Sequence, residues 1–200
     1  MNNKSLQIDA ILLAAGSSSR FGSDKRLLLI DGVPMLQRAL ASIIDTVHSV
    51  TIVIKQDDRD ILPQLLGKFI TDTRVCPLLL EFPGAGMGSN LAQAVSRLSE
   101  KSDGVLVMLA DMPYVQSNTV SAVVNAGKAD RVVVPVFIDS ASKENRGHPV
   151  LFSRRFFSEL ALLSGDSGAR SLLEHHAQSV IFLPVPDSGI LRDIDFFTEH

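Results

Sequence analysis

A loop rich in glycine and serine carries the first chemical signal in the sequence. It runs LAAGSSSRFGSDK from Leu13 to Lys25 and follows an apolar run. Small residues let backbone N–H groups approach a ligand, and a series of such groups binds anions. Arg20 and Lys25 add two positive charges, which suit a polyphosphate. The loop is therefore predicted to bind phosphate, with a flexible turn carrying two solvated cations as the alternative. It has the spacing of neither a P-loop nor a dinucleotide fingerprint.

A carboxylate follows a second apolar run. Asp111 comes directly after Val105–Ala110 and two residues before Pro113. If the run is a strand, the carboxylate stands at the edge of the sheet where α/β proteins bind ligands, and it could hold a hard divalent cation. An aspartate before proline is also typical of a helix N-cap or a turn. Position alone leaves both readings open.

Alternating segments are expected to position these residues. Short runs rich in Val, Ile and Leu without strict alternation are typical of strands buried on both faces: Ile8–Ala14, Val50–Ile54, Val105–Ala110, Val132–Phe137 and Val180–Val185. Segments with a period near 3.6 lie between and after them: Met35–Ile44, Ser89–Leu98, Asn118–Asn125, Phe156–Leu163 and Gly168–Ala177. This order predicts one domain over residues 1–200, an α/β three-layer α/β/α sandwich with a mostly parallel, Rossmann-like sheet. The polar stretch Ile138–Arg146 is predicted to be a loop.

Composition excludes several classes of protein. Apolar residues make up 46% of the 200 residues, enough for a packed core. The net charge of −3 argues against a nucleic-acid or anionic-membrane binder. A single cysteine, Cys76, cannot form a disulfide within the chain, so a partly buried thiol in a cytoplasmic protein is expected. No apolar run is long enough for a membrane span.

Six motifs carry a family resemblance. The loop at residues 13–25 resembles the L-A-A-G-x-S-x-R-x-G-x-x-K signature of the nucleotidyltransferases related to molybdenum cofactor cytidylyl- and guanylyltransferase. Five later stretches resemble further family motifs in the same order: Gly86–Leu91 (GMGSNL), Leu109–Pro113 (LADMP), Arg146–Pro149 (RGHP), Gly165–Arg170 (GDSGAR) and Asp193–Asp195 (DID). Asn90 stands where the family usually has serine. The resemblance covers nearly the whole chain and is closest to the cytidylyltransferase branch.

The resemblance implies a fold and a reaction. The fold would be that of the nucleotide-diphospho-sugar transferases. The reaction would be the Mg²⁺-dependent attack of the terminal phosphate of molybdopterin on the α-phosphate of a nucleoside triphosphate, with release of pyrophosphate; Mn²⁺ is the alternative metal. Such a step needs charge neutralisation and alignment rather than a protein nucleophile.

Carried over by motif, the resemblance implies a role for each site residue. Lys25, Arg20 and Asp111 would be catalytic, with Lys25 and Arg20 on the triphosphate and Asp111 on the metal. Asp195 would be the second metal ligand, with Asp193 as the neighbouring alternative. The nucleotide would be bound by Leu13, Ala14, Ala15, Gly16, Arg20, Lys25, Gly86, Met87, Gly88 and Ser89. The acceptor would be bound by Arg146, Gly147, His148 and Arg170. A histidine held by local backbone is the competing reading of His148.

The base and the partners follow from the same resemblance. Ala15 gives the loop the L-A-A-G form of the cytidylyl branch, so CTP is favoured over GTP. A molybdoenzyme or a maturation factor is the expected protein partner. The alternatives are a GTP-using enzyme, transfer to another phosphorylated acceptor, and a non-catalytic chaperone that binds nucleotide or cofactor. Arg26 is interpreted as a solvated or ion-paired neighbour of Lys25, and no spacing recommends Asp57 or Asp58 for a role.

Overall fold

Runs of Val, Ile, Leu and Ala form the central sheet. The computed structural model describes residues 6–16, 24–80, 86–166 and 168–194. Within them the sheet has eight strands: β1 (Ile8–Leu13), β4 (Val50–Lys55), β5 (Val75–Leu80), β6 (Gly104–Leu109), β7 (Val132–Ile138), β8 (Glu144–Arg146), β9 (Val150–Ser153) and β10 (Val180–Pro184). The order is β10-β7-β9-β6-β1-β4-β5, and β8 pairs with β7. A separate hairpin joins β2 (Leu29–Ile30) to β3 (Val33–Pro34).

The sheet is mostly parallel. β1 pairs in parallel with both β4 and β6, β4 with β5, and β7 with β10. β9 is antiparallel to β6 and β7, and β8 is antiparallel to β7. The carboxyl ends of β1, β4 and β6 therefore meet at one edge of the sheet, where the loops predicted to bind ligand begin.

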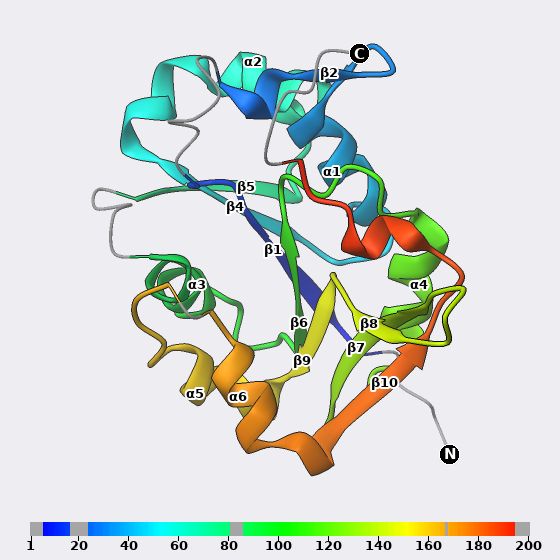
Figure 1. The fold of residues 1–200 in the computed structure, drawn as a ribbon. Helices are drawn as coiled ribbons and strands as arrows, with labels where there is room; N and C mark the ends of the chain where they lie inside the picture. Colours follow the sequence, from blue (N-terminus) through cyan, green and yellow to red (C-terminus); the bar gives the residue numbers. More distant parts are fainter. Residues whose placement is uncertain (1–5, 17–23, 81–85, 167, 195–200) are drawn as a thin grey trace.

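Helices cover both faces of this sheet (Figure 1). They are α1 (Met35–Ile43), α2 (Leu62–Leu66), α3 (Met87–Val95), α4 (Ser117–Asn125), α5 (Phe157–Leu160) and α6 (Arg170–His175). Short 3₁₀ turns join them: η1 (Lys25–Leu27), η2 (Gln56–Ile61), η3 (Gly67–Thr71), η5 (Arg154–Phe156), η6 (Ala177–Ser179) and η7 (Ser188–Leu191). The predicted three-layer α/β sandwich is thus confirmed.

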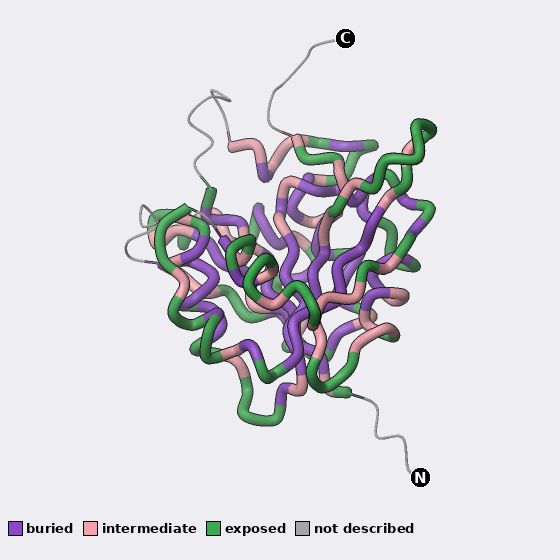
Figure 2. Tube along the Cα trace, turned by 60° about the horizontal axis from the view of Figure 1, so that its bottom comes forward, coloured by how far each residue is buried: buried purple, intermediate pink, exposed green. Residues whose placement is uncertain are grey.

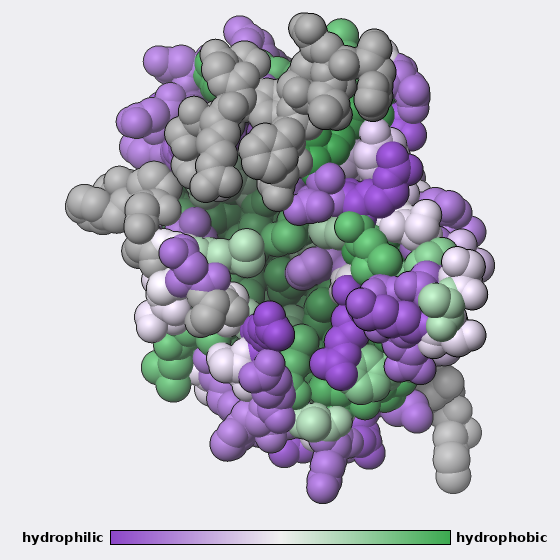
Figure 3. All heavy atoms as spheres, in the orientation of Figure 1, coloured by the Kyte–Doolittle hydropathy of each residue, from purple (hydrophilic) through white to green (hydrophobic). Residues whose placement is uncertain are grey.

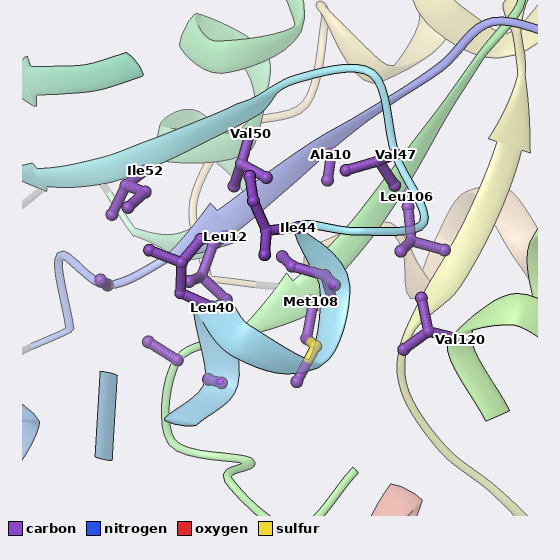
Figure 4. Close-up of a cluster of buried hydrophobic side chains, with 14 of the residues drawn as sticks. Ala10, Leu12, Leu40, Ile44, Val47, Val50, Ile52, Leu106, Met108 and Val120 are labelled. Carbon is purple, nitrogen blue, oxygen red and sulfur yellow. The ribbon is translucent and has the colours of Figure 1, made fainter. Parts of the chain in front are cut away.

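Two apolar clusters hold the layers together because successive strand side chains point to opposite faces. Ala10 and Leu12 of β1 pack with α1, α2 and α4 in one cluster, whereas Ile11 packs with α3, α5 and α6 in the other. Figure 4 shows the first cluster, where Leu40 and Ile44 lie against the strands. In Figure 2 the buried residues form the centre of the molecule and the exposed ones its periphery. No helix among the described residues is long and apolar enough to cross a membrane.

The structure corrects three local predictions. The predicted loop Ile138–Arg146 contains β8, which pairs with the end of β7. Two strands were not predicted: β9, which is only four residues long, and β5, whose Pro77 argues against a strand. The Cys76 thiol is exposed rather than partly buried, because β5 lies at the edge of the sheet.

Candidate active site

A cavity of about 460 Å³ opens at the carboxyl ends of β1 and β6. Eight of the residues predicted for nucleotide, catalysis or metal line it: Leu13, Ala14, Ala15, Gly16, Lys25, Gly86, Met87 and Asp111. They come from segments up to about 100 residues apart, which the parallel sheet brings to one edge. We call this the first cavity. Arg20 and Asp195 lie outside the described residues.

Gly88 and Ser89 support the first cavity from outside its wall. Gly88 N–H donates to the carbonyl oxygen of Gly165 at 2.8 Å, and the Ser89 hydroxyl accepts from Gly165 N–H at 3.2 Å. Gly86 has φ +92°, and a Cβ there would lie 2.4 Å from the Gly165 carbonyl carbon. The approach of the two backbones explains the glycine at position 86. These contacts dock the turn at Gly165 onto the start of α3.

Lys25 and Asp111 form an ion pair in the wall of the first cavity. Lys25 Nζ lies 2.8 Å from Asp111 Oδ2 and 3.4 Å from the carbonyl oxygen of Ile194, to which it also donates. Both side chains are about one-fifth exposed. The backbone N–H of Ile194 donates to the Asp111 carbonyl at 3.0 Å, so the segment before Asp195 runs beside Asp111. A cation and a carboxylate, the kinds of group that can bind a phosphate and a divalent metal, therefore stand together in this wall.

The Asp111 carboxylate fits the ligand set of a hard divalent cation. Its Oδ1 is buried and has no hydrogen-bond partner among the described residues, so one oxygen is available for coordination. Mg²⁺ is commonly held by one or two carboxylates together with substrate phosphates. Among the residues that the structure describes, no group of three His, Cys, Asp or Glu side chains converges on one point. One carboxylate plus phosphate oxygens is thus the arrangement that these residues support.

Arg26, the residue after Lys25, forms a largely buried ion cluster with Asp58 and Asp24. Arg26 is 8% exposed and Asp58 is 7% exposed. The Arg26 guanidinium donates to the carboxylates of both Asp58 and Asp24 and to the carbonyl oxygen of Ala14. Burial alone would raise the pKa of Asp58 and Asp24, but their hydrogen bonds to Arg26 and its charge hold both pKa values below the ordinary range. Of the two readings of Arg26, the ion-paired one is confirmed, and Asp58 gains a structural role that its spacing did not indicate.

Replacing Asp58 with asparagine is expected to lower stability in a pH-dependent way. A depressed carboxyl pKa adds stability above the unfolded-state pKa of about 4, and this is lost as pH falls through the folded-state value. The Asp58→Asn variant should be less stable by about 3 kcal/mol at pH 7, with the difference shrinking below about pH 4. Thermal unfolding from pH 7 to pH 3 measures this. Asp72→Asn is the matched control, because Asp72 makes the same kind of pair with Arg74 at a more exposed, half-buried site. A deficit that stays constant down to pH 3 would contradict the assignment.

A second cavity of about 750 Å³ adjoins the first. All four residues predicted for the acceptor line it: Arg146, Gly147, His148 and Arg170. Its floor is apolar and includes Val107, Val134 and Phe152 of the sheet. Figure 3 shows a hollow on this face whose floor is largely hydrophobic. Leu13, Met87 and Leu109 line both cavities, so the two cavities are direct neighbours.

The polar residues of the second cavity differ in how firmly they are held. His148 Nδ1 donates to the carbonyl oxygen of Val107 on β6 at 3.4 Å, a long-range contact rather than one with local backbone. Burial lowers the pKa of His148 below its ordinary value, and this outweighs the opposite effects of the Val107 carbonyl and the Asp111 charge. The Arg146 guanidinium lies 4.4 Å from the centre of the Phe182 ring. The Arg170 side chain is 85% exposed and pairs with Glu174.

Besides Arg26, three polar residues that line the first cavity were not predicted to bind nucleotide or metal: Lys55, Asn90 and Asp166. Asn90 is the most informative of these. It is 7% exposed, and its Oδ1 has no hydrogen-bond partner among the described residues. A buried amide oxygen without a donor is costly, so a ligand group that donates a hydrogen bond would stabilise it. The signal in the sequence was an amide within the otherwise small and apolar stretch at the start of α3.

The parallel sheet, the glycine-rich loop and the lysine–aspartate pair define an α/β nucleotidyltransferase. A model of the MobA-like NTP transferase domain matches residues 10–180, and the chain belongs to this family. A relative from Trichormus variabilis named "Probable molybdenum cofactor guanylyltransferase" is 30% identical and covers 94% of this chain and 84% of its own length.

Solved structures are similar over the same extent. The crystal structure of Rv0371c from Mycobacterium tuberculosis H37Rv has a TM-score of 0.76 and 27% identity, covering 91% of this chain and 89% of that one. A manganese complex of Rv0371c has a TM-score of 0.72 and 23% identity, with the same coverage of both chains, and is similar in fold.

Proposed function

We propose that this nucleotidyltransferase transfers the nucleotidyl group of a nucleoside triphosphate to the terminal phosphate of molybdopterin or the molybdenum cofactor. The observation that carries the proposal is the pair of adjoining cavities. Lys25 and Asp111 line the first cavity, the predicted acceptor residues line the second, and Leu13, Met87 and Leu109 line both. Two substrates bound side by side can react in line without a covalent enzyme intermediate. The name of the Trichormus variabilis relative, which matches over most of its length, supports the molybdenum cofactor as the acceptor.

The proposed step balances without a protein nucleophile. An oxygen of the acceptor phosphate attacks the α-phosphorus, the new P–O bond forms, and the bond to the β-phosphate breaks, so that pyrophosphate leaves. The Lys25 ammonium stabilises the negative charge on the α-phosphate as it is attacked. Asp111 would hold a divalent cation, Mg²⁺ or Mn²⁺, whose charge when bound neutralises the phosphates. Arg20 and Asp195 keep their proposed roles on pyrophosphate and metal.

GTP is the donor that we propose first. The Trichormus variabilis relative is named for guanylyl transfer, and this name supports GTP as the donor. CTP is the second candidate, because the buried Ala15 places a methyl group where the guanylyl branch has glycine. Asn90 Oδ1 offers an acceptor to an amino group of either base or to a ribose hydroxyl. A methyl group alone discriminates weakly between ligands that otherwise fit, so the residues favour CTP only modestly.

An assay of pyrophosphate release tests the proposal. Purified protein is mixed with molybdopterin, Mg²⁺ and one of CTP, GTP, ATP or UTP, and pyrophosphate and the nucleotidylated product are measured. We expect release only when acceptor and nucleotide are both present, fastest with GTP. Fastest release with CTP would move the donor to the second candidate. Release with N-acetylglucosamine 1-phosphate but not with molybdopterin would refute the proposed acceptor. A contact with a molybdoenzyme or a maturation factor that receives the product is part of the same proposal.

A further inference from the structure

All five N–H donors of Arg26 are used within the protein. Nε donates to Asp24 Oδ1 at 2.8 Å, and Nη2 donates to Asp24 Oδ2 at 2.5 Å and to Asp58 Oδ1 at 2.8 Å. Nη1 donates to Asp58 Oδ2 at 2.5 Å and to the Ala14 carbonyl at 3.2 Å. A guanidinium has five such donors. Although Arg26 lines the first cavity, it has no donor left for a ligand.

The partners of Arg26 belong to three segments that contribute residues to the wall of the first cavity. Ala14 begins the glycine-rich loop, and Asp24 caps the turn η1 that carries Lys25. Asp58 lies in η2, directly after β4, and its carboxylate also accepts from the backbone N–H of Lys55 at 3.0 Å. One buried side chain thus joins both ends of the loop to the end of the neighbouring strand.

The charges around Arg26 argue against a direct contact between its guanidinium and phosphate. The Arg26 guanidinium is already paired with two carboxylates, those of Asp24 and Asp58, so its positive charge is neutralised within the protein. A phosphate contact from Arg26 would also have to break one of its charged, buried hydrogen bonds, which is costly. Arg26 therefore acts on the nucleotide through the backbone that it holds.

We propose that Arg26 is a positioning residue that fixes the two described ends of the glycine-rich loop, at Ala14 and Asp24, and, through η1, the place of the Lys25 ammonium beside Asp111. This role rests on the proposed function, because it concerns the same site. A displacement of about 1 Å in a positioning group can cost about 100-fold in rate, so a loosened loop should be visible in kinetics.

The chain contains a matched control for Arg26. Arg74 and Asp72 repeat the Asp-x-Arg geometry: Arg74 N donates to Asp72 Oδ1 at 3.0 Å, and Nη2 donates to Oδ2 at 2.8 Å. Nη1 of Arg74 likewise donates to a carbonyl oxygen, that of Ile44. Arg74 directly precedes β5, at the amino end of the sheet and away from the first cavity, and its side chain is 41% exposed. The two arginines share their local contacts and differ in burial and place.

The experiment separates positioning from stability with Arg26→Met, Arg74→Met and the double variant Arg26→Met/Asp58→Asn. Removing Arg26 leaves the buried Asp58 carboxylate and the half-buried Asp24 carboxylate without the guanidinium, so Tm should fall. Asp58→Asn removes one of these charges, and the double variant should recover at least half of the lost Tm. The affinity for the wild-type enzyme's best nucleotide with Mg²⁺ is then measured for every variant. Hydrogen exchange at Leu27 and Leu28, whose amides donate within η1, follows the loop in the absence of ligand.

The positioning role predicts that the double variant recovers thermal stability without recovering nucleotide affinity. Both Arg26 variants should bind nucleotide at least tenfold more weakly and lose about 100-fold in kcat/KM. Hydrogen exchange at Leu27 and Leu28 should be at least tenfold faster in both variants. A further variant, Arg26→Lys, should have an affinity, a kcat/KM and an exchange rate between those of Arg26→Met and those of the wild type. Arg74→Met should match the wild type in nucleotide affinity, in kcat/KM and in exchange at Leu27 and Leu28. Wild-type affinity in the restored double variant would overturn the positioning role alone. A wild-type protein that binds no nucleotide would overturn the proposed function and this role with it.

Discussion

Replacing Lys25 with alanine is expected to lower kcat by about 100- to 1,000-fold while the protein stays folded. Removing one preorganised group that stabilises transition-state charge typically has an effect of this size. Lys25 is about one-fifth exposed and lies in the wall of the first cavity, where its ammonium bonds to Asp111 and Ile194, so the fold should tolerate its loss. Because the charge is needed most when the α-phosphate is attacked, kcat should fall more than KM rises. Steady-state kinetics of pyrophosphate release, with Tm measured beside it, checks this.

Lys101→Ala is the control for Lys25→Ala. Lys101 is an exposed lysine in the turn before β6, at the opposite end of that strand from Asp111, and lines neither cavity. It should change neither kcat nor KM. Turnover near the wild-type value in Lys25→Ala would remove Lys25 from the reaction and leave the lysine–aspartate pair as a structural contact.

Replacing Asp111 with asparagine is expected to abolish most of the activity, by about 1,000-fold or more. The change keeps the size of the side chain and an oxygen for Lys25, but it removes the negative charge that a divalent cation requires. The folded state should tolerate it, because Asp111 Oδ1 has no hydrogen-bond partner to lose among the described residues. The affinity for Mn²⁺ in the presence of nucleotide, measured by electron paramagnetic resonance, should fall at least tenfold together with the rate.

Asp103→Asn is the matched variant for Asp111. Asp103 precedes the amino end of β6, opposite Asp111, and accepts a hydrogen bond from the backbone of Gln7. It should leave Mn²⁺ affinity and turnover unchanged. Tight Mn²⁺ binding in Asp111→Asn would assign the metal to other carboxylates and favour the alternative reading of Asp111 as a turn residue.

Local sequence patterns predicted the parts of the fold that depend on local physics. The long apolar runs became β1, β4, β6, β7 and β10. The first four fit the rule that a strand buried on both faces needs apolar residues along its length, whereas β10 is an edge strand that is only partly buried. β9 escaped prediction because its four residues are stabilised by long-range pairing with β6 and β7. β5 contains Pro77, which an edge strand tolerates, and no local pattern tells which strand lies at the edge.

The candidate site was predictable to the same extent. Residues within motifs, such as Lys25 and Asp111, were named because the family resemblance was added to their place in or after an expected loop or strand. The bond between Arg26 and Asp58 joins positions 32 residues apart, and only the packing of η1 against η2 brings them together. Asn90 was named only as a departure from a motif, because its burial and its unpaired oxygen are properties of the folded chain.

Thermal unfolding with nucleotides tests the central claim, that the first cavity binds a nucleoside triphosphate together with a divalent metal. The protein is unfolded with CTP, GTP, ATP and UTP, each with and without Mg²⁺. A ligand at about 100 times its Kd stabilises the folded state by about 2.7 kcal/mol, which corresponds to a rise in Tm of about 5–10 °C for a chain of this size. We expect a magnesium-dependent rise, largest with GTP and lost in Asp111→Asn. Folded protein whose Tm moves with none of the four nucleotides would contradict the account.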